Sequence, residues 1–483
     1  MIIDKDAQDI TWKLFDLDRG MNLTNREWLD HALNLLFLKY ICDLSSTQST
    51  NISMRLEKLI GKIQWDDFVK ASNLGKALDK SVNTVIEVNP ELKTILNETE
   101  FSKIPERNLN QMISILNDPQ IENNGFGLFS NYAAIAESMI DFEASNNQKD
   151  GGQNFTPKWV TQLMARLVSP QKDMTIHDPV CGTGGLFVEC AKLLSQKDQG
   201  FSQLHFFGQE KDAQTSKICQ INLLLHGLDD FKVQTGDTLR DPKFIKSDNL
   251  DQFDAVVANP PLNINDWGYE EFYRQDKLNR FRYGIPPRKN GDFAFIQHII
   301  ATMKPDSGKA IILVSPGVLF RSGVEQDIRA GILESDIVEA AIVLPANLLY
   351  NTVIPVAILI LNRNKPESRQ NKVLIVDGSN EYNKLNRGAN SFNAKNIDDI
   401  VEIFNDFEKL DKNKSGLSKL ASLQDIETIR NNDYQLNANR YITAPRTRID
   451  VETKRLELND LICDRWELEN KIDEILEELE LLK

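Results

Sequence analysis

Apolar residues in the first part of the chain recur at the spacing of an α-helix. In segment 28–44 the recurring apolar positions are Leu29, Ala32, Leu33, Leu36, Phe37 and Tyr40. Steps of three and four residues place these side chains on one face of a helix, with polar residues on the other. Further amphipathic stretches follow, interrupted by prolines, which end helices. We therefore predict a helical N-terminal domain over residues 1–145.

The pattern changes after the polar, glycine-containing segment 145–154, which we interpret as a domain boundary. Short apolar runs, typical of buried strands, then alternate with stretches of helical spacing. We assign strands to residues 174–178, 204–209, 231–236, 253–259, 309–315, 339–344, 356–362 and 372–377. The alternation predicts the α/β class, with a doubly wound, Rossmann-like and largely parallel sheet over residues 146–380.

The apolar runs become sparse after residue 380, so we expect a mixed extension over residues 381–449. Residues 450–483 have the pattern of one long helix, with apolar residues at steps of three and four. A seam this narrow favours contact with a partner helix over packing on the rest of the chain, and both interpretations stay open.

Composition narrows the class of protein. The chain has 483 residues and a formal net charge of −15, which argues against a free-standing DNA-binding protein, because such proteins neutralise phosphates with a basic surface. No apolar run reaches the roughly 18 residues of a membrane span, and the first residues lack the apolar core of a secretion signal. The cysteines are scattered without a C-x-x-C pair, so we expect no disulfide framework, no zinc site and a reduced, cytoplasmic location.

Three predicted strands end on residues suited to an adenosine-like ligand. The first runs into DPVCGTGGL, residues 178–186, whose glycines let the backbone turn sharply and approach a ligand. Glu210 ends the next strand, where a carboxylate can accept both hydroxyls of a ribose, and Asp237 follows the third, where it can accept from an adenine amine. The lysine of a phosphate-binding loop is missing from the motif, so we expect no triphosphate. Because the carboxyl ends of parallel strands share one edge, these residues predict one pocket.

The fourth of these strands ends in NPPL, residues 259–262. Proline fixes the backbone and has no amide donor, which leaves carbonyl groups free. The side-chain oxygen of Asn259 and the carbonyl of Pro260 can therefore accept hydrogen bonds from one planar NH2 group. Such bonds favour a pyramidal, nucleophilic nitrogen that attacks a neighbouring sulfonium methyl in line, with proximity supplying most of the rate.

Together these motifs resemble those of a known enzyme family. The order FTP, DPVCGTGG, GQE, GDTL and NPP resembles the S-adenosylmethionine-dependent DNA methyltransferases that modify amino groups, in their gamma arrangement. Residues 280–334 are similar to the modification subunit of type I restriction–modification systems, and the helical N-terminus and terminal helix also fit that family. The resemblance covers nearly the whole chain and implies a site-specific DNA N6-adenine methyltransferase.

The resemblance implies roles for the matching positions. The residues implied to hold S-adenosylmethionine are Asn154, Phe155, Thr156, Pro157, Asp178, Gly182, Thr183, Gly184, Gly185, Glu210 and Asp237. The residues implied to hold the target adenine, once it is flipped out of the duplex, are Asn259, Pro260, Pro261 and Leu262. The few histidines are dispersed, and we expect no metal ligand.

The family also implies partners. No segment is left over for a target-recognition domain, so a separate specificity subunit would choose the DNA site. The implied complex contains DNA, the specificity subunit and a second copy of the modification subunit, with a restriction subunit in the full endonuclease and no membrane contact. Residues 450–483 would contact the specificity subunit, and the N-terminal domain would help to clamp DNA.

Leu262 departs from the family pattern, in which the fourth residue of the motif is an aromatic that stacks on the flipped base. Base–aromatic stacking is worth about 1–3 kcal/mol, so its loss would lower activity roughly 5- to 150-fold. Trp267, Phe281 and Tyr283 are candidates for a replacement face. One alternative is an inert scaffold subunit that binds the cofactor without transferring the methyl group. Another is methylation of protein glutamine or ribosomal RNA, because enzymes of those classes share the NPP motif.

The segment 274–289 is a basic patch in an otherwise acidic chain. Its cations are Arg274, Lys277, Arg280, Arg282, Arg288 and Lys289, opposed only by Asp276. We predict a contact with the DNA backbone near the active face, with a solvated loop as the alternative.

Overall fold

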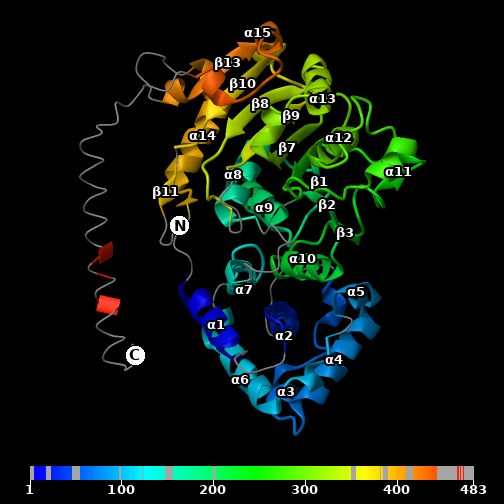
Figure 1. The fold of residues 1–483 in the computed structure, drawn as a ribbon. Coiled ribbons are helices and arrows are strands. Elements are labelled where there is room, and N and C mark those ends of the chain that lie inside the picture. Colours follow the sequence, from blue (N-terminus) through cyan, green and yellow to red (C-terminus); the bar gives the residue numbers. More distant parts are fainter. Residues whose placement is uncertain are drawn as a thin grey trace, which may run out of the picture. The chain divides into compact units, whose positions relative to one another are not determined.

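The computed structural model describes most of the chain, and Figure 1 shows its elements in chain order. The described residues are 5–17, 23–45, 55–96, 99–122, 125–146, 156–198, 203–349, 355–380, 382–384, 390–409, 417–442, 465–466, 468 and 471–472. The chain divides into two compact units, Met1–Ile442 and Thr443–Lys483.

The first part of the chain is helical, as its hydrophobic pattern predicts. Its helices are α1 (Lys5–Asp16), α2 (Asn25–Leu44), α3 (Trp65–Val69), α4 (Leu74–Val88), α5 (Lys93–Leu96), α6 (Glu106–Leu116) and α7 (Asn131–Asn146). Helix α2 begins with a reciprocal cap, in which Thr24 and Glu27 each accept a hydrogen bond from the backbone N–H of the other. Beyond this cap α2 is buried on all sides, because α3, α6, α7 and α10 (Ala213–Leu225) pack around it.

A sheet of nine strands follows, in the order β13-β10-β8-β9-β7-β6-β1-β2-β3. The strands are β1 (Thr175–Asp178), β2 (His205–Glu210), β3 (Phe231–Thr235), β6 (Ala255–Ala258), β7 (Lys309–Val314), β8 (Val338–Val343), β9 (Ala357–Asn362), β10 (Lys372–Asp377) and β13 (Ala421–Asp425). Neighbours are parallel except where β9 pairs with β7 and β8 and where β13 pairs with β10. The predicted α/β class and largely parallel sheet are confirmed. Because the order reverses between β1 and β6, the carboxyl ends of these two strands flank a crevice.

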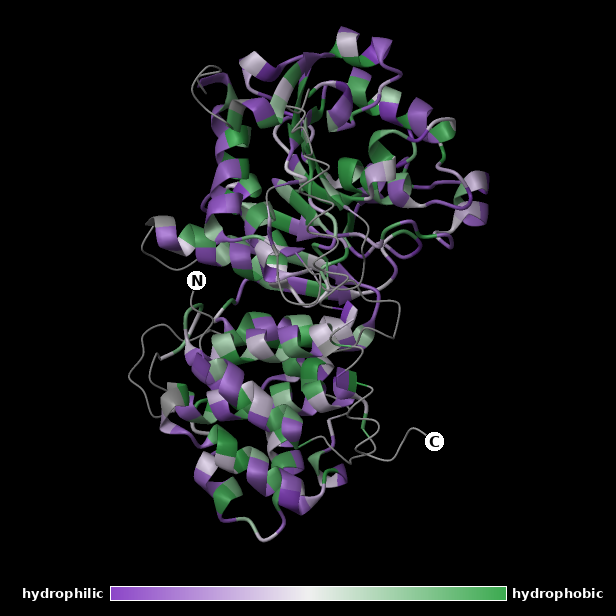
Figure 2. Cartoon of the chain, turned by 60° about the vertical axis from the view of Figure 1, so that its left-hand side comes forward, coloured by the Kyte–Doolittle hydropathy of each residue, from purple (hydrophilic) through white to green (hydrophobic). Residues whose placement is uncertain are grey.

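Helices cover both faces of this sheet (Figure 1). One face packs against α8 (Lys158–Val168), α9 (Gly185–Asp198), α10 and α14 (Ala394–Asp406), and the other against α12 (Asp292–Thr302) and α13 (Val324–Glu334). Within β6, Val257 belongs to the first hydrophobic cluster and Val256 to the second. Burial on both faces explains why the strands are continuous apolar runs, which appear green in Figure 2.

The remaining elements are small. They are α11 (Tyr269–Arg274), α15 (Ile426–Asn431) and the two-stranded pairs β4 (Ile245–Lys246) with β5 (Asn249–Leu250) and β11 (Asn383–Lys384) with β12 (Asn390–Ser391). In the second unit, the described residues 465–466, 468 and 471–472 are helical and exposed. The rest of the predicted terminal helix lies outside the described residues. Among the described residues, no helix is long and apolar enough to cross a membrane.

The segment between β6 and α12 corrects the predicted basic patch at one position. Arg280 is only 4% exposed. Its Nε donates to Asp276 at 3.1 Å, its Nη1 donates to the carbonyl of Leu239 at 2.8 Å, and its guanidinium lies over the ring of Phe272 at 4.8 Å. Arg280 therefore braces the turn after β3, because the fold encloses its long side chain among aromatic rings. The other cations of the patch, Arg274, Lys277, Arg282, Arg288 and Lys289, are exposed or partly exposed.

We expect Arg280→Met to lower the free energy of unfolding by about 3–5 kcal/mol, because it leaves the buried Asp276 carboxylate without its cation. Lys277→Ala, a matched change on the exposed side of the same segment, is expected to stay within about 0.5 kcal/mol. Urea denaturation of the two variants measures both values. Equal, small losses would show that Arg280 does not brace the turn.

Candidate active site

The carboxyl ends of β1, β2, β3 and β6 border a cavity of about 570 Å³. Nine of the residues that the resemblance implies for cofactor and target binding line it: Thr156, Asp178, Gly182, Thr183, Gly185, Glu210, Asp237, Asn259 and Pro261. Cavities of this size hold ligands of the size of a nucleoside cofactor. The topology thus brings together residues that lie far apart in the sequence, as expected for the switch point of a doubly wound sheet.

The glycine-rich turn joins β1 to α9. Gly182 and Gly184 have φ values of 54° and 82°, in the left-handed region that favours glycine. Gly184 does not border the cavity, because it faces α10, where an added Cβ would lie 2.9 Å from Cys219 Sγ. Its role is to let the turn pack on α10, while Gly182, Thr183 and Gly185 face the cavity.

Two carboxylates lie at the ends of β1 and β2, of which Asp178 is buried and Glu210 is partly buried. Asp178 is 1% exposed and accepts from the N–H of Val180 at 2.9 Å. Glu210 accepts from the N–H of Gly182 at 3.1 Å and from that of Asp212 at 2.9 Å. Burial raises the pKa of both side chains above the ordinary range, well above it for Asp178. These groups therefore gain from any ligand that donates hydrogen bonds to them.

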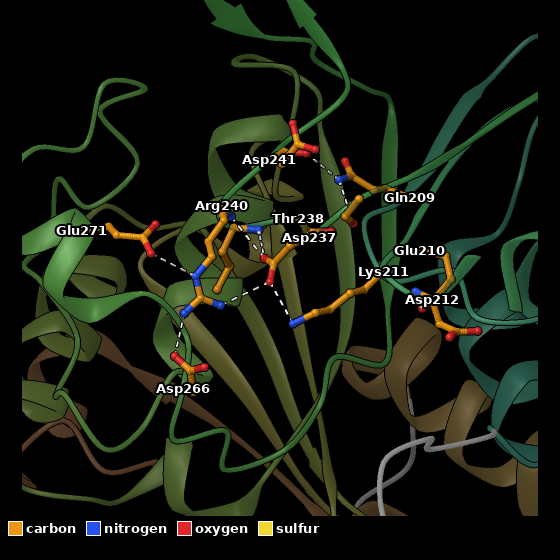
Figure 3. Close-up of polar contacts among 12 residues, drawn as sticks. Gln209, Glu210, Lys211, Asp212, Asp237, Thr238, Arg240, Asp241, Asp266 and Glu271 are labelled. Carbon is orange, nitrogen blue, oxygen red and sulfur yellow. Dashed lines mark hydrogen bonds and ion pairs between the residues drawn. The ribbon is translucent and has the colours of Figure 1, made fainter. Parts of the chain in front are cut away.

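Asp237, after β3, lies in a different environment (Figure 3). Its carboxylate accepts from the N–H groups of Leu239 and Arg240, both at 3.1 Å, and contacts Lys211 Nζ at 3.0 Å. Burial by itself raises the pKa of Asp237, but the hydrogen bonds from Lys211 and Arg240 together hold it below the ordinary value. Asp237 is therefore an ionised acceptor at neutral pH.

Sequence analysis missed Lys211 and Arg240. The guanidinium of Arg240 reaches Asp237 at 3.3 Å, Asp266 at 2.6 Å and Glu271 at 3.2 Å, so it ties the turn after β3 to the loop after β6 (Figure 3). Lys211 directly follows Glu210, and its side chain is 68% exposed. A ligand amine at Asp237 would compete with this exposed lysine for the carboxylate. No motif marks either residue, because only the fold brings them to Asp237.

Asn259 lies at the end of β6, and only the NH2 group of its side-chain amide is hydrogen-bonded within the described residues. Its Nδ2 donates to Thr156 Oγ1 at 2.7 Å. Its Oδ1 is buried and has no hydrogen-bond partner among the described residues. A buried acceptor without a partner costs about 1–3 kcal/mol, so this oxygen is available for a ligand that donates to it. The Thr156 hydroxyl therefore orients Asn259, and α8 begins after Pro157 without a side-chain cap.

The loop beyond the prolines is firmly held. Asn263 has a left-handed backbone with φ 54°, its N–H donates to Asp292 at 2.8 Å, and its side-chain oxygen accepts from Arg321 at 2.5 Å. Pro260 is buried, and Leu262 is half-buried against the larger hydrophobic cluster. Neither Pro157, Pro260 nor Leu262 lines the cavity.

The predicted residues Asn154 and Phe155 lie outside the described residues. Of the aromatic candidates for a replacement face, Trp267 lines the cavity, while Phe281 and Tyr283 do not. Trp267 is 1% exposed, and its ring is stacked on that of Phe272 with centroids 5.9 Å apart. Among the described residues, no group of three or more metal-ligating side chains is poised to hold a metal ion.

Comparison with known proteins places the chain in a family. The model of the family described as N-6 DNA methylase matches residues 131–450. The chain is 31% identical over 426 residues to the type I restriction enzyme MjaVIII methylase subunit of Methanocaldococcus jannaschii, covering 83% of this chain and 69% of the relative. It is 28% identical to the type I restriction enzyme HindI methylase subunit of Haemophilus influenzae, covering 77% of this chain and 84% of the relative.

A solved structure shares the fold. The type I restriction–modification system methyltransferase subunit from Streptococcus thermophilus superposes with a TM-score of 0.75 at 21% identity, covering 91% of this chain and 99% of that one. The doubly wound fold and the match to the family model together define a methyltransferase. The chain belongs to the N-6 DNA methylase family and, within it, to the methylase subunits of type I restriction enzymes. The family, enzyme class and cofactor predicted from the sequence are confirmed.

The residues present fit S-adenosylmethionine. Asp178, Glu210 and Asp237 line the cavity and are acceptors for hydroxyl and amine groups. Acidic side chains outnumber the single lysine, Lys211, in the lining, which suits a ligand that carries a sulfonium cation.

We expect Thr156→Val to slow methyl transfer about 10-fold, because it removes the oxygen that orients Asn259 and leaves Nδ2 unpartnered. Thr156→Ser keeps that oxygen and serves as the matched control, with a rate near that of the unmodified protein. Single-turnover methylation measures the rate constant, and calorimetry measures cofactor affinity, which should change less. Equal rates in the two variants would contradict the role of Thr156.

We expect cofactor affinity to weaken as the pH falls from about 8 through the raised pKa of Glu210, which lies above the ordinary value of about 4.3. Only the ionised carboxylate accepts from two hydroxyls, so binding is strongest above that pKa and is lost below it. Glu210→Gln should weaken binding at neutral pH and flatten this part of the profile. Calorimetry across the pH range tests this, and an unchanged slope in the variant would refute it.

Proposed function

We propose that the chain transfers a methyl group from S-adenosylmethionine to N6 of adenine in DNA, as the modification subunit of a type I restriction–modification complex. The observation that carries the proposal is the Asn259 side chain, whose buried Oδ1 beside the cavity has no partner in the part of the chain that the structure describes. An acceptor fixed at that place suits an amino group that must be held while it reacts. The family to which the chain belongs supplies the substrate class.

The chemistry follows from the groups around this acceptor. Asn259 Oδ1 and the carbonyl of Pro260 accept hydrogen bonds from the target amine, which favours a lone pair directed at its reaction partner. Bound S-adenosylmethionine supplies an electrophilic methyl group. Thr156 fixes the amide, and Pro260 and Pro261 limit movement of the backbone, so orientation supplies most of the rate. The amine proton leaves after attack, and no strong general base is needed.

The cofactor residues have distinct proposed roles. Glu210 holds the ribose hydroxyls and Asp237 the adenine amine, while Asp178 and the turn at Gly182, Thr183 and Gly185 hold the methionine end. Asn154, Phe155 and Pro157 would close over that end, and Gly184 acts by letting the turn pack on α10.

A second candidate function is an inert scaffold subunit that binds the cofactor without transferring the methyl group. It is favoured by Leu262, which offers no aromatic face and packs against the hydrophobic cluster instead. Trp267 borders the cavity but is enclosed by other rings, so it stacks on them. The first proposal stands ahead because the hydrogen-bonding part of the site is intact.

We propose that this chain works in a complex whose subunits have separate roles. The acidic chain would supply catalysis, and a separate specificity subunit would choose the DNA site and contact residues 450–483. A second modification subunit and, in the full endonuclease, a restriction subunit would complete the assembly. The exposed cations Arg274, Lys277 and Lys289 lie between the NPPL loop and α12, where they can contact the phosphate backbone. The helical N-terminal domain 1–145 would help to clamp DNA.

We expect N6-methyladenine at a bipartite motif in the genome of a host that lacks its own systems and carries this gene with its neighbours. The same set of genes with Asn259→Ala in this chain should leave the motif unmethylated. Sequencing that detects modified bases gives the result. If neither strain carries the mark although the protein is folded and binds S-adenosylmethionine, the active-enzyme proposal is overturned in that setting.

Leu262→Phe separates the two candidates in the same host. If the site is only weakened, the added ring should raise activity by roughly 5- to 150-fold, the range expected for base stacking. No methylation in either protein would favour the scaffold.

A further inference from the structure

A carboxylate outside the cavity connects both halves of the site. Glu137 lies in the middle of α7 and receives cations from two other helices. Its Oε2 contacts Lys158 Nζ at 2.5 Å, at the first residue of α8, and its Oε1 contacts Lys192 of α9. His226, directly after α10, contacts the same Oε1 with Nε2 at 2.9 Å. One side chain thus ties α7 to α8, α9 and α10.

The ion pair with Lys158 connects Glu137 to Asn259, the proposed acceptor for the target amine. Lys158 follows Thr156 and Pro157, and the ring of Pro157 fixes φ between them. Because Thr156 Oγ1 accepts from Asn259 Nδ2, a displacement of the first turn of α8 moves the group that orients Asn259. The ion pair with Glu137 opposes such a displacement.

The link through His226 leads to the other half of the site. One turn before His226 on α10, Asn222 Nδ2 donates to the carbonyl of Thr183 at 2.8 Å, in the glycine-rich turn. Glu137 therefore braces the helix that supports this turn, besides the start of α8. Helix α7 in turn packs against α1 and α2, so the helical first part of the chain is joined to the site at Glu137.

The charge around Glu137 supports this bracing role. Its side chain is 17% exposed and that of Lys192 15%, so water screens their contact little, whereas Lys158 is 37% exposed and its contact is screened more. Burial opposes ionisation of Glu137, but His226, Lys192 and Lys158 hold its pKa well below the ordinary value. Two further carboxylates lie close by: Glu189 of α9 contacts Lys192 at 3.9 Å, and Asp141, one turn further along α7, has a pKa raised to about 6 by burial and then by the charge of Glu137. Glu137 nevertheless makes the shortest described ion pair of both Lys158 and Lys192.

We propose that Glu137 is a positioning residue for methyl transfer, which holds Thr156 against Asn259 through its ion pair with Lys158. The inference rests on the proposed function, because the step that it serves is the transfer. Glu137 contacts no reacting group, so its loss should act on the rate constant of transfer and not primarily on cofactor binding.

The test uses the complete complex with three variants of this subunit. Lys158→Met breaks only the link to α8 and leaves Glu137 paired with Lys192 and His226, so the fold is retained. Glu137→Gln removes the common carboxylate. Glu339→Gln is the matched control, because it removes another buried carboxylate, paired with Arg369 at 3.1 Å, that does not line the cavity.

We expect Lys158→Met and Glu137→Gln to lower the single-turnover rate constant of methyl transfer about 10- to 100-fold, as small misplacements in active sites do. The dissociation constant of S-adenosylmethionine should change less than about 3-fold, since the carboxylates that line the cavity are intact. The double variant Lys158→Met/Glu137→Gln should be little slower than Glu137→Gln alone, because Glu137→Gln already breaks the ion pair that Lys158→Met removes. Glu339→Gln should leave the rate unchanged.

Hydrogen exchange measured by mass spectrometry gives a second readout that needs no activity. Peptides that cover the start of α8 should exchange faster in Lys158→Met and Glu137→Gln than in Glu339→Gln. Unchanged exchange there, or a Lys158→Met complex that transfers methyl at the unmodified rate, would overturn the inference. Faster exchange in a complex that never methylates DNA would overturn the proposed function and leave the link from Glu137 to α8 standing.

Discussion

The buried side-chain amide of Asn259 has an NH2 group that needs a hydrogen-bond acceptor and an oxygen that needs a donor. This constraint organises the site. Asn259 gives its NH2 group to Thr156 and leaves its oxygen without a partner among the described residues. The unmet acceptor costs free energy of about 1–3 kcal/mol in the free protein, which the surrounding structure must offset. It does so with a strand buried on both faces, two prolines and a loop anchored at Asn263. The site is therefore organised before any ligand arrives.

The carboxylates at the same edge show how environment separates side chains of one type. Burial raises the pKa of Asp178 and Glu210, which have few charged neighbours of opposite sign. The Lys211 and Arg240 contacts lower that of Asp237, although it lies at the same edge. A ligand that donates hydrogen bonds to Asp178 and Glu210 lowers their free energy. Asp237 is an ionised acceptor, and its cations must move aside when a ligand binds to it. An acidic cavity with one exposed lysine is suited to a cationic cofactor.

Much of this arrangement could be predicted from the sequence. Apolar runs without alternation gave strands buried on both faces, and the ends of four such runs carry Asp178, Glu210, Asp237 and Asn259, which the sheet order brings to one cavity. The prediction that Arg280 belongs to an exposed basic patch was wrong. A basic residue in a basic segment is expected to be exposed, but the fold encloses this side chain among aromatic rings. Lys211 and Arg240 were not predicted as partners of Asp237, since no motif spacing marks them.

By itself, the sequence determined the α/β class, the order of the motifs and the residue types at each strand end, because these depend on local periodicity and on steric limits such as those of Gly182 and Pro260. Only the tertiary structure decided which end of the Asn259 amide is free and which carboxylate is paired with lysine. It alone joined Glu137 to Lys158, Lys192 and His226. These are contacts between elements distant along the chain, and their geometry is set by packing, which no local pattern of residues encodes.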